Sequence, residues 1–368
     1  MKYEIPLSSS IIHLDNKIEA LSTSTNYIEE FESSIEGYIL QKKKVVALNS
    51  GTSAIHLALI LSRVEKRDKV ICQSFTFSAS ANPIVYQGAN PIFIDSEKDT
   101  WNMCPKALEK AIKCEISKGK KPKAIIVVHL YGMPAKMEKI LAIAKKYDIT
   151  LIEDAAESLG SRYKGQKCGS FGDFGILSFN GNKMITTSGG GALICKTDKA
   201  KQRALFLATQ ARDDTTYYQH SEIGYNYRMS NVLAGIGRSQ MELIDNHVLL
   251  RRKMNSFYQK LFKSVNGVTV FTEPSAEYFS NHWLSCILID SSITGFTRED
   301  LRLQLEKDNI ESRPLWKPMH LQPVFKGYDY YGSNIAETFF DSGLCLPSGS
   351  NLTDDDREKI AESIRKLL

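Results

Sequence analysis

Residues 149–193 read ITLIEDAAESLG (149–160), SRYKGQKCGSFGDFGILSF (161–179) and NGNKMITTSGGGAL (180–193). A first apolar run, residues 149–152, ends in two carboxylates, Glu153 and Asp154. A second apolar run, residues 174–179, ends in a polar loop that leads to Lys183. Short apolar runs bounded by glycine and polar loops are typical of buried strands. The stretch therefore predicts two strands, one ending in an acid and the next in a loop that presents a lysine.

Around this stretch, from about residue 45 to residue 193, strand-like and helix-like segments alternate. Such alternation predicts an α/β fold with a mostly parallel sheet covered on both faces. Sites in these sheets lie on the loops at the carboxyl ends of the strands. The predicted strands are 70–72, 91–94, 124–130, 150–153, 175–179 and 192–195, and the predicted helices are 52–61, 106–114 and 137–146.

The character of the sequence changes near residue 245. A chain of 368 residues is long enough for one large domain and a smaller one. We expect a large domain at 1–244 and a small α+β domain at 245–368. Within the small domain the patterns predict helices at 245–262, 298–308 and 351–368, the last with Thr353 as its N-cap, and a strand at 283–289.

Composition and charge are those of an ordinary soluble globular protein. The formal net charge of +5 is small for this length, so nucleic acid is not an expected partner. Seven cysteines occur without a CxxC motif, which indicates a reducing compartment and favours neither zinc nor a disulfide framework. No signal peptide or membrane-length apolar run is evident, so we expect a cytoplasmic protein without a membrane partner and without a metal.

The segment 49–54, NSGTSA, precedes an apolar helical pattern. Small residues at a helix N-terminus leave backbone N–H groups available, and the helix dipole favours an anion there. The segment is therefore a candidate phosphate seat, although serine and threonine are also ordinary helix caps. Two aromatic residues, Phe75 and Phe77, follow the predicted strand 70–72, and both are first interpreted as core residues.

Asp154 and Lys183 are the residues of this stretch best suited to catalysis. A buried carboxylate needs a partner, and AAESL after Asp154 resembles a helix start, so a salt bridge or a helix cap would explain the acid alone. Lys183 precedes the glycine-rich run 186–191, which leaves room for another molecule. A lysine that bonds to an aldehyde and an acid that keeps a pyridinium nitrogen protonated are the groups that pyridoxal phosphate chemistry needs. The glycine spacing fits neither a nucleotide P-loop nor a Rossmann motif.

Two later segments combine cations with aromatic residues. Residues 224–230, GYNYRMS, contain an arginine suited to planar or phosphate anions, and a surface loop of stacked tyrosines is the alternative. Residues 313–320, RPLWKPMH, form a proline-stiffened loop that is typical of a binding loop.

These segments, in this order, resemble the DegT/DnrJ/StrS sugar aminotransferases, a branch of the aspartate-aminotransferase-like fold-type I enzymes that use pyridoxal phosphate. The resemblance extends over nearly the whole chain. Within the family, the sequences of these segments are most similar to those of the UDP-4-keto-6-deoxy-N-acetylglucosamine 4-aminotransferases. The segments that carry it are NSGTSAIHLAL, SFTFSASANPIVYQGANPIFID, HLYGMPAKM, IEDAAESLGSRYKG, GSFGDFGILSFNGNKMITTSGGGAL, GYNYRMSNVLAGIG and RPLWKPMH.

The resemblance implies a role for each matching residue. Lys183 would bond to the cofactor and later move a proton, and Asp154 would bind the ring nitrogen. Phe77 would stack on the ring, and Asn226 would reach the cofactor phosphate of the other subunit in a homodimer with shared sites. The other implied cofactor contacts are Gly51, Thr52, Ser53, Glu157 and Ser178, and the implied sugar-nucleotide contacts are Arg228, Trp316, Lys317 and His320.

The implied reaction moves an amino group from L-glutamate to C4 of a UDP-4-keto-6-deoxy-N-acetylhexosamine, for surface glycan biosynthesis. Glu157 stands where many relatives have His or Gln, and Glu is known in the bacillosamine-type branch. The segment before Asn26 is short and lacks the glycine-rich opening of many relatives. Open alternatives are a 3-aminotransferase, a 4-aminotransferase for another nucleotide sugar, and a non-catalytic regulatory homologue. A related sugar dehydratase is disfavoured, because it has histidine at the position of Lys183.

Overall fold

The structure is a computed structural model that describes residues 3–9, 26–40 and 42–368, so most of the segment before Asn26 lies outside the described residues. Its centre is an eight-stranded sheet with the order β1-β9-β8-β5-β4-β2-β3-β14. The strands from β8 to β14 pair in parallel, and β9 runs antiparallel to β8 and β1. The predicted mostly parallel sheet is confirmed. The strands are β1 (Lys44–Leu48), β2 (Lys69–Gln73), β3 (Asn90–Ile94), β4 (Ala124–Val128), β5 (Thr150–Asp154), β8 (Phe174–Ser178), β9 (Gly191–Cys195) and β14 (Asp329–Tyr331).

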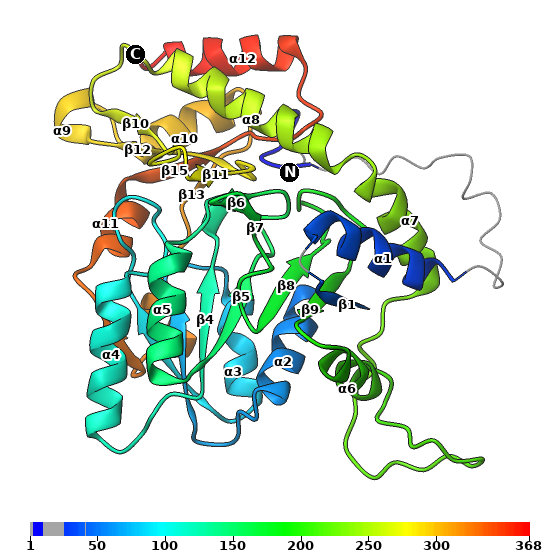
Figure 1. Ribbon diagram of the computed structural model, residues 1–368. Helices are drawn as coiled ribbons and strands as arrows, with labels where there is room; N and C mark the ends of the chain where they lie inside the picture. The colour runs from blue at the N-terminus through cyan, green and yellow to red at the C-terminus, as the bar shows by residue number, and fades with distance from the viewer. Residues whose placement is uncertain (1–2, 10–25, 41) are drawn as a thin grey trace.

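Helices cover both faces of this sheet (Figure 1). Successive residues of a strand point to opposite faces, and in β4 Ile125 and Val127 pack in one core cluster whereas Ile126 packs in another. Because both faces are buried, the strands consist of continuous apolar runs. The first cluster includes α4 (Pro105–Ser117) and α5 (Met137–Tyr147), and the second includes α2 (Gly51–Leu61), α3 (Asn82–Tyr86) and α6 (Asp198–Ala208).

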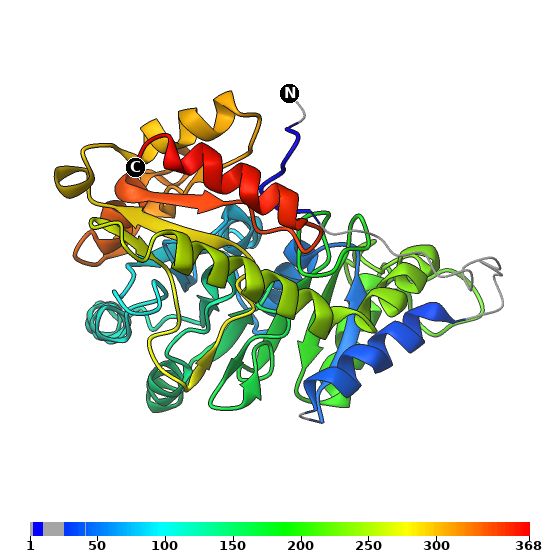
Figure 2. The same ribbon diagram turned by 90° about the horizontal axis from the view of Figure 1, so that it is seen from above.

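A four-stranded sheet with the order β10-β12-β15-β13 forms the centre of the C-terminal third, at the top of Figure 1. The long helix α8 (Ile244–Leu261) leads into it and runs across the molecule in Figure 2. Thr353 caps α12 as predicted, in a reciprocal capping box with Asp356. The elements are β10 (Val268–Val270), α9 (Ser291–Thr294), β12 (Ser285–Ile289), α10 (Arg298–Lys307), β13 (Arg313–Pro314), α11 (Ile335–Ser342), β15 (Gly343–Leu346) and α12 (Asp354–Arg365).

Other elements connect the two parts of the chain. In a three-stranded sheet, β11 (Tyr278–Phe279) pairs with the hairpin of β6 (Arg162–Tyr163) and β7 (Gln166–Lys167). Helix α1 (Tyr27–Ile39) packs beside α7 (Asn231–Met241). Since β14 also returns from the C-terminal third to the large sheet, the division at residue 245 stays a prediction. Among the helices that the structure describes, none is both long and apolar enough to span a lipid bilayer.

The predicted helix start at AAESL is wrong, because residues 155–159 form turns. Asn281 supplies the physical reason. Its Nδ2 group donates to the carbonyl oxygens of Glu157 and Leu159, at 2.8 and 2.9 Å. These two hydrogen bonds stabilise the turns by satisfying carbonyl oxygens within them. The local structure is thus supported by a side chain more than a hundred residues away.

The predicted strand 124–130 ends at Val128, earlier than expected. Residues 130–132 form a 3₁₀ turn in which Tyr131 has a left-handed backbone, with φ 54°. Non-glycine residues rarely adopt this conformation, and it marks sites where tertiary contacts outweigh local preference.

Asp95, directly after β3, connects the large sheet to the C-terminal third. Its buried carboxylate accepts hydrogen bonds from the backbone N–H groups of Ser333, Ile335 and Ala336, at 2.8, 2.9 and 3.0 Å. Two of these groups belong to the first turn of α11, where a helix leaves its N–H groups unpaired. Asp95 therefore fixes the start of α11 on the edge of the sheet.

We expect Asp95→Ala to lower the free energy of unfolding by about 3 kcal/mol, because three N–H groups lose their shared acceptor. Urea unfolding followed by circular dichroism measures this. Asp341→Ala is the matched control, since Asp341 is an exposed carboxylate of the same helix and should change stability by less than about 0.5 kcal/mol. Equal losses in the two variants would contradict the role of Asp95.

Candidate active site

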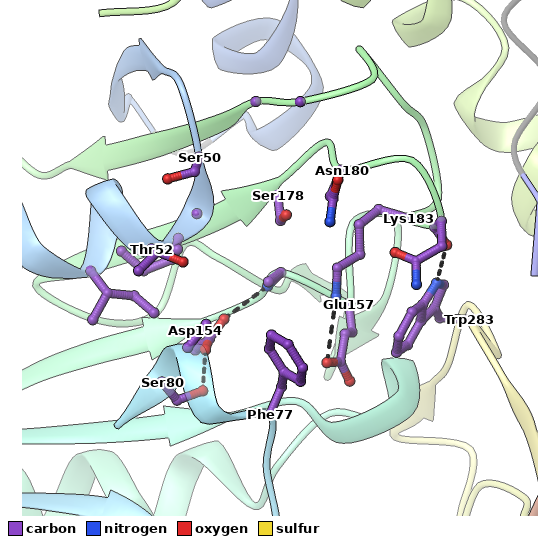
Figure 3. A pocket seen from close by; sticks show the side chains of 18 of the residues that line it. Ser50, Thr52, Phe77, Ser80, Asp154, Glu157, Ser178, Asn180, Lys183 and Trp283 are labelled. Carbon is purple, nitrogen blue, oxygen red and sulfur yellow. Dashed lines mark hydrogen bonds and ion pairs between the residues drawn. The ribbon is translucent and has the colours of Figure 1, made fainter. Parts of the chain in front are cut away.

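A cavity of about 400 Å³ lies between the carboxyl ends of β5 and β8, the first turn of α2 and the C-terminal third. Its volume is typical of a small-molecule site. Figure 3 shows the side chains of Asp154, Glu157 and Lys183 converging on it. Of the predicted site residues, Gly51, Thr52, Phe77, Asp154, Glu157, Ser178, Lys183 and Trp316 line the cavity.

The first turn of α2 forms one end of the cavity. Ser50 caps the helix, and its Oγ accepts from the N–H of Ser53 at 3.0 Å. A Cβ atom on Gly51 would lie 3.2 Å from the Cβ of Ser178, so the helix start approaches the end of β8 closely. The N–H groups and positive dipole end of α2 thus face the cavity next to two hydroxyls, those of Thr52 and Ser178. This end suits a phosphate.

Asp154 ends β5 and is 5% exposed. Its Oδ2 accepts from Ser80 Oγ at 2.7 Å, and its Oδ1 accepts from the N–H of Ala156 at 3.1 Å (Figure 3). These two neutral donors orient the carboxylate. Because Asp154 also lines the cavity, it can pair with a protonated ring nitrogen there.

Glu153 does not line the cavity, although it directly precedes Asp154. It meets His129 and Cys168 in a buried group of three potential metal ligands. Its carboxylate already accepts from His129 Nε2 and from three backbone N–H groups of residues 169–172, at 2.5 to 3.0 Å. Four donors saturate a carboxylate, so Glu153 anchors this loop beside β5.

Lys183 reaches the cavity from the loop after β8. Its Nζ lies 3.6 Å from Glu157 Oε1 and 4.2 Å from the centre of the Trp283 ring. The Trp283 indole N–H donates to the carbonyl oxygen of Asn182 at 2.7 Å. The lysine is therefore held through its side chain and through the backbone next to it.

Glu157 is 4% exposed, and its Oε2 accepts from the backbone N–H of Tyr131 at 2.7 Å. The left-handed turn at Tyr131 aims this N–H group at the carboxylate. Burial raises the pKa of Glu157 to about 7, and nearby Lys183 opposes the shift. Glu157 is thus a carboxyl group that can change its protonation near neutral pH beside the lysine.

Three predicted contacts lie elsewhere. Ser53 donates its hydroxyl to Asn49 Oδ1 at 2.6 Å and does not line the cavity. Lys317 is exposed outside the cavity. His320 uses both ring nitrogens in the fold, with Nδ1 2.6 Å from Ser74 Oγ and Nε2 3.1 Å from a Glu337 oxygen. The structure brings none of the three to the cavity of its own chain.

Asn226 and Arg228 also lie outside this cavity. The side chain of Arg228 donates to Glu32 and, at 3.0 Å, to the carbonyl oxygen of Ala47. Asn226 is exposed, and its carbonyl oxygen accepts from Asn49 Nδ2 at 3.1 Å. Their predicted roles across a dimer stay predictions.

Some lining residues were missed by the sequence analysis. Ser80 and Asn180 are close in sequence to Phe77 and Lys183, so they had a local signal. Trp283 had no local sequence signal, because no motif surrounds it and its contact with the lysine loop joins residues about a hundred positions apart. Arg313 lines the cavity from the segment interpreted as a binding loop.

The donor set of the cavity fits pyridoxal phosphate. The start of α2 with Thr52 and Ser178 suits the phosphate, and Asp154 suits the ring nitrogen. Phe77 offers a ring that is 55% exposed toward solvent and the cavity. Phe75, interpreted as core, is fully buried. Lys183 completes the set.

Comparisons with known proteins agree with this cofactor. The model of the DegT/DnrJ/EryC1/StrS aminotransferase family matches residues 16–365. A relative from Bacillus subtilis (strain 168), described as the putative pyridoxal phosphate-dependent aminotransferase EpsN, is 49% identical over 329 residues, which cover 88% of this chain and 84% of the relative. The GDP-perosamine synthase of Escherichia coli O157:H7 is 36% identical over 349 residues, which cover 94% and 92%.

A solved structure has the same fold along the whole chain. The PLP-form of the putative sugar aminotransferase Spr1654 from Streptococcus pneumoniae has a TM-score of 0.88 and 26% identity, and the match covers 100% of both chains. The predicted fold class and the predicted cofactor are both confirmed.

The raised pKa of Glu157, about 7 against 4.5 for an ordinary glutamate, predicts a pH-dependent stability. Between these values the folded chain holds a proton that the unfolded chain has lost, so stability falls as pH rises from about 5 to about 7. Glu157→Gln removes this titration. Relative to the wild type, the variant should gain up to about 3 kcal/mol between pH 4.5 and pH 8.

Urea unfolding of the cofactor-free protein at several pH values measures this difference. Glu138→Gln is the control, because the hydrogen bond from Lys164 lowers the pKa of Glu138 and keeps its titration below this pH range. Parallel pH profiles for the wild type and Glu157→Gln would contradict the role of burial.

Proposed function

The chain belongs to the DegT/DnrJ/EryC1/StrS aminotransferase family and is a pyridoxal-phosphate-dependent sugar aminotransferase, and from this premise we propose that it transfers the amino group of L-glutamate to C4 of a UDP-linked 4-keto-6-deoxy-N-acetylhexosamine. The product is a UDP-linked 4-amino-4,6-dideoxy sugar for a surface glycan. The observation that carries the proposal is that Asp154, Lys183 and the start of α2 line one cavity.

Pyridoxal phosphate, when bound, supplies the electron sink that such a transfer needs. The chain's own residues would hold it at both ends: Thr52 and Ser178 would bind the phosphate, and Asp154 would keep the ring nitrogen protonated. Lys183 would bond to it at rest, and its amine, once released, would take the proton from the α-carbon of the amino donor as a general base. Asp154, Glu157 and Lys183 are largely buried, which strengthens their electrostatic effect.

The choice of sugar rests on sequence motifs that this chain shares with one branch of the family. The segments around Asp154, Lys183 and Trp316 resemble the UDP-4-keto-6-deoxy-N-acetylglucosamine 4-aminotransferases, and Glu157 matches the bacillosamine-type branch. A GDP-linked keto sugar is the alternative, because a GDP-perosamine synthase is 36% identical over most of the chain. Amination at C3 of a keto sugar is a further alternative.

We also propose that the working unit is a homodimer in the cytoplasm. Asn226 is exposed outside the cavity of its own chain, where a second subunit can meet it. The neighbouring segment exposes Tyr217, Tyr218 and Ile223 to solvent, and exposed apolar side chains of this size are typical of contact surfaces. The seven cysteines are free thiols, which suits a reducing compartment.

Reduction of the purified yellow protein with sodium borohydride should attach the cofactor's mass to the peptide that contains Lys183. Peptide mass spectrometry identifies the site. Lys183→Ala should carry no such mass and should lose activity by more than about a thousandfold. A label on another lysine would remove Lys183 from its assigned role.

A panel of nucleotide sugars tests the substrate. With L-glutamate, the UDP-linked 4-keto-6-deoxy-N-acetylhexosamine should give a product with an amine at C4, identified by mass spectrometry and NMR, together with 2-oxoglutarate. GDP-linked 4-keto and UDP-linked 3-keto sugars are the comparison arms. Turnover of one of these alone would refute the proposed sugar but leave the aminotransferase assignment intact.

Subunit mixing tests the shared site. Lys183→Ala and Asn226→Ala homodimers each have two impaired sites. A mixed dimer has one intact site if Asn226 acts across the interface, so random mixing should restore about a quarter of wild-type activity. If Asn226 acts in its own chain, or if the protein is a monomer, mixing should restore none.

A further inference from the structure

Trp283 is the residue of the C-terminal third that contacts Lys183 most directly. It lies just before β12 and is 2% exposed. Figure 3 shows its ring beside the lysine side chain, to the right of Glu157. No segment around Trp283 carries a recognisable motif, so its part in the site comes from the fold alone.

Two separate contacts join Trp283 to the lysine. The face of its ring lies 4.2 Å from Lys183 Nζ, measured to the ring centre. Its indole N–H donates to the carbonyl oxygen of Asn182 at 2.7 Å, so it also binds the peptide group that precedes Lys183. One side chain therefore contacts both the reactive end of the lysine and its backbone.

Trp283 is itself held in place by its backbone. Its N–H donates to Asn281 Oδ1 at 2.8 Å, and its carbonyl oxygen accepts from Arg251 Nη1 at 2.7 Å. Arg251 is fully buried on α8. The same helix carries His247, whose Nδ1 donates to the carbonyl oxygen of Met184 at 3.0 Å. The carbonyl oxygens of the residues before and after Lys183, Asn182 and Met184, are thus both bound by elements outside the lysine's own loop.

Two groups that attract a cation lie next to Lys183 Nζ. The carboxyl group of Glu157 lies 3.6 Å away, and an aromatic face attracts a cation through its quadrupole. Indole is the strongest aromatic partner for a cation, and burial strengthens the attraction. Once Lys183 has accepted a proton, its Nζ therefore has a defined position near a carboxyl group and a ring.

We propose that Trp283 is a positioning residue that holds Lys183 Nζ in the ammonium form it reaches once it has accepted the substrate proton, and that fixes the loop that carries the lysine. This inference rests on the proposed role of Lys183 in binding the cofactor. The ring face acts on the charge of the amine, and the indole N–H acts on the peptide group of Asn182. These two effects can be separated by substitution.

The test measures how fast Lys183 reacts with acetic anhydride in the full-length, cofactor-free protein, by peptide mass spectrometry. Only a neutral amine reacts. Trp283→Leu removes both contacts and should speed the reaction on the order of tenfold. Trp283→Phe keeps an aromatic face but loses the N–H group, and should stay within about threefold of the wild type. Trp101→Leu, a tryptophan that lies outside the cavity and stacks on Phe271, is the control and should leave the rate unchanged.

Loss of a large ring also opens access to the lysine, so a variant of equal shape is needed. Tetrafluorotryptophan at position 283 keeps the shape and the N–H group but removes the negative face of the ring. It should raise the reaction rate several-fold, in the same direction as Trp283→Leu. The fluorinated variant also tests the proposal by itself if Trp283→Leu fails to fold.

A wild-type rate with tetrafluorotryptophan would overturn the proposal and leave Trp283 as a packing residue. A faster rate in Trp101→Leu would overturn it as well, because the effect would then be a general loosening of the fold. The borohydride experiment on the wild type separates the two proposals. If Lys183 carries no label, the cofactor assignment is refuted. If Lys183 is labelled but the fluorinated variant reacts with acetic anhydride at the wild-type rate, only the role of Trp283 is refuted.

Discussion

The parallel pairing of β5 with β8 is the constraint on which the site depends. Parallel strands end at the same edge of a sheet, and Asp154 pairs with Ile176 near the end of β8. The acid at the end of β5 and the loop that follows β8 therefore open into the same cavity. The close contact between Gly51 and Ser178 brings the start of α2 to the same edge. Groups that suit a ring nitrogen, a phosphate and an aldehyde carbon thus lie in one place.

The C-terminal third completes the site by holding the lysine. Trp283 and His247 donate to the carbonyl oxygens of Asn182 and Met184, on either side of Lys183. From the N-terminal segment, Ser8 Oγ also donates to the carbonyl oxygen of Asn182, at 2.9 Å. A loop rich in glycine and asparagine has little order of its own. These contacts give the lysine a defined geometry, which catalysis by positioned groups requires. The large sheet carries the reactive side chains, and contacts from the other part of the chain fix the position of the lysine loop.

Sequence patterns predicted the elements whose structure is decided locally. Apolar runs marked six of the eight strands of the large sheet, all except β1 and β14, and Thr353 marked the start of α12. The patterns failed where distant side chains contribute. Asn281 binds the carbonyl oxygens of Glu157 and Leu159 and stabilises turns where a helix start was expected. Glu157 was known from its position in a motif, but its burial, which raises its pKa, depends on the surrounding packing, and the hydrogen bond from the Tyr131 backbone opposes that rise.

By itself, the sequence determined the order of strands and helices, the acid and the lysine at their strand ends, and the family with its cofactor. These features depend on periodicity and on short motifs, which neighbouring residues encode. Only the tertiary structure decided which of two adjacent acids enters the cavity, and that Trp283 faces the lysine. It also showed that both ring nitrogens of His320 contact side chains of the fold, those of Ser74 and Glu337. These outcomes depend on contacts between residues far apart in the chain, and no local pattern records which distant side chain satisfies a buried polar group.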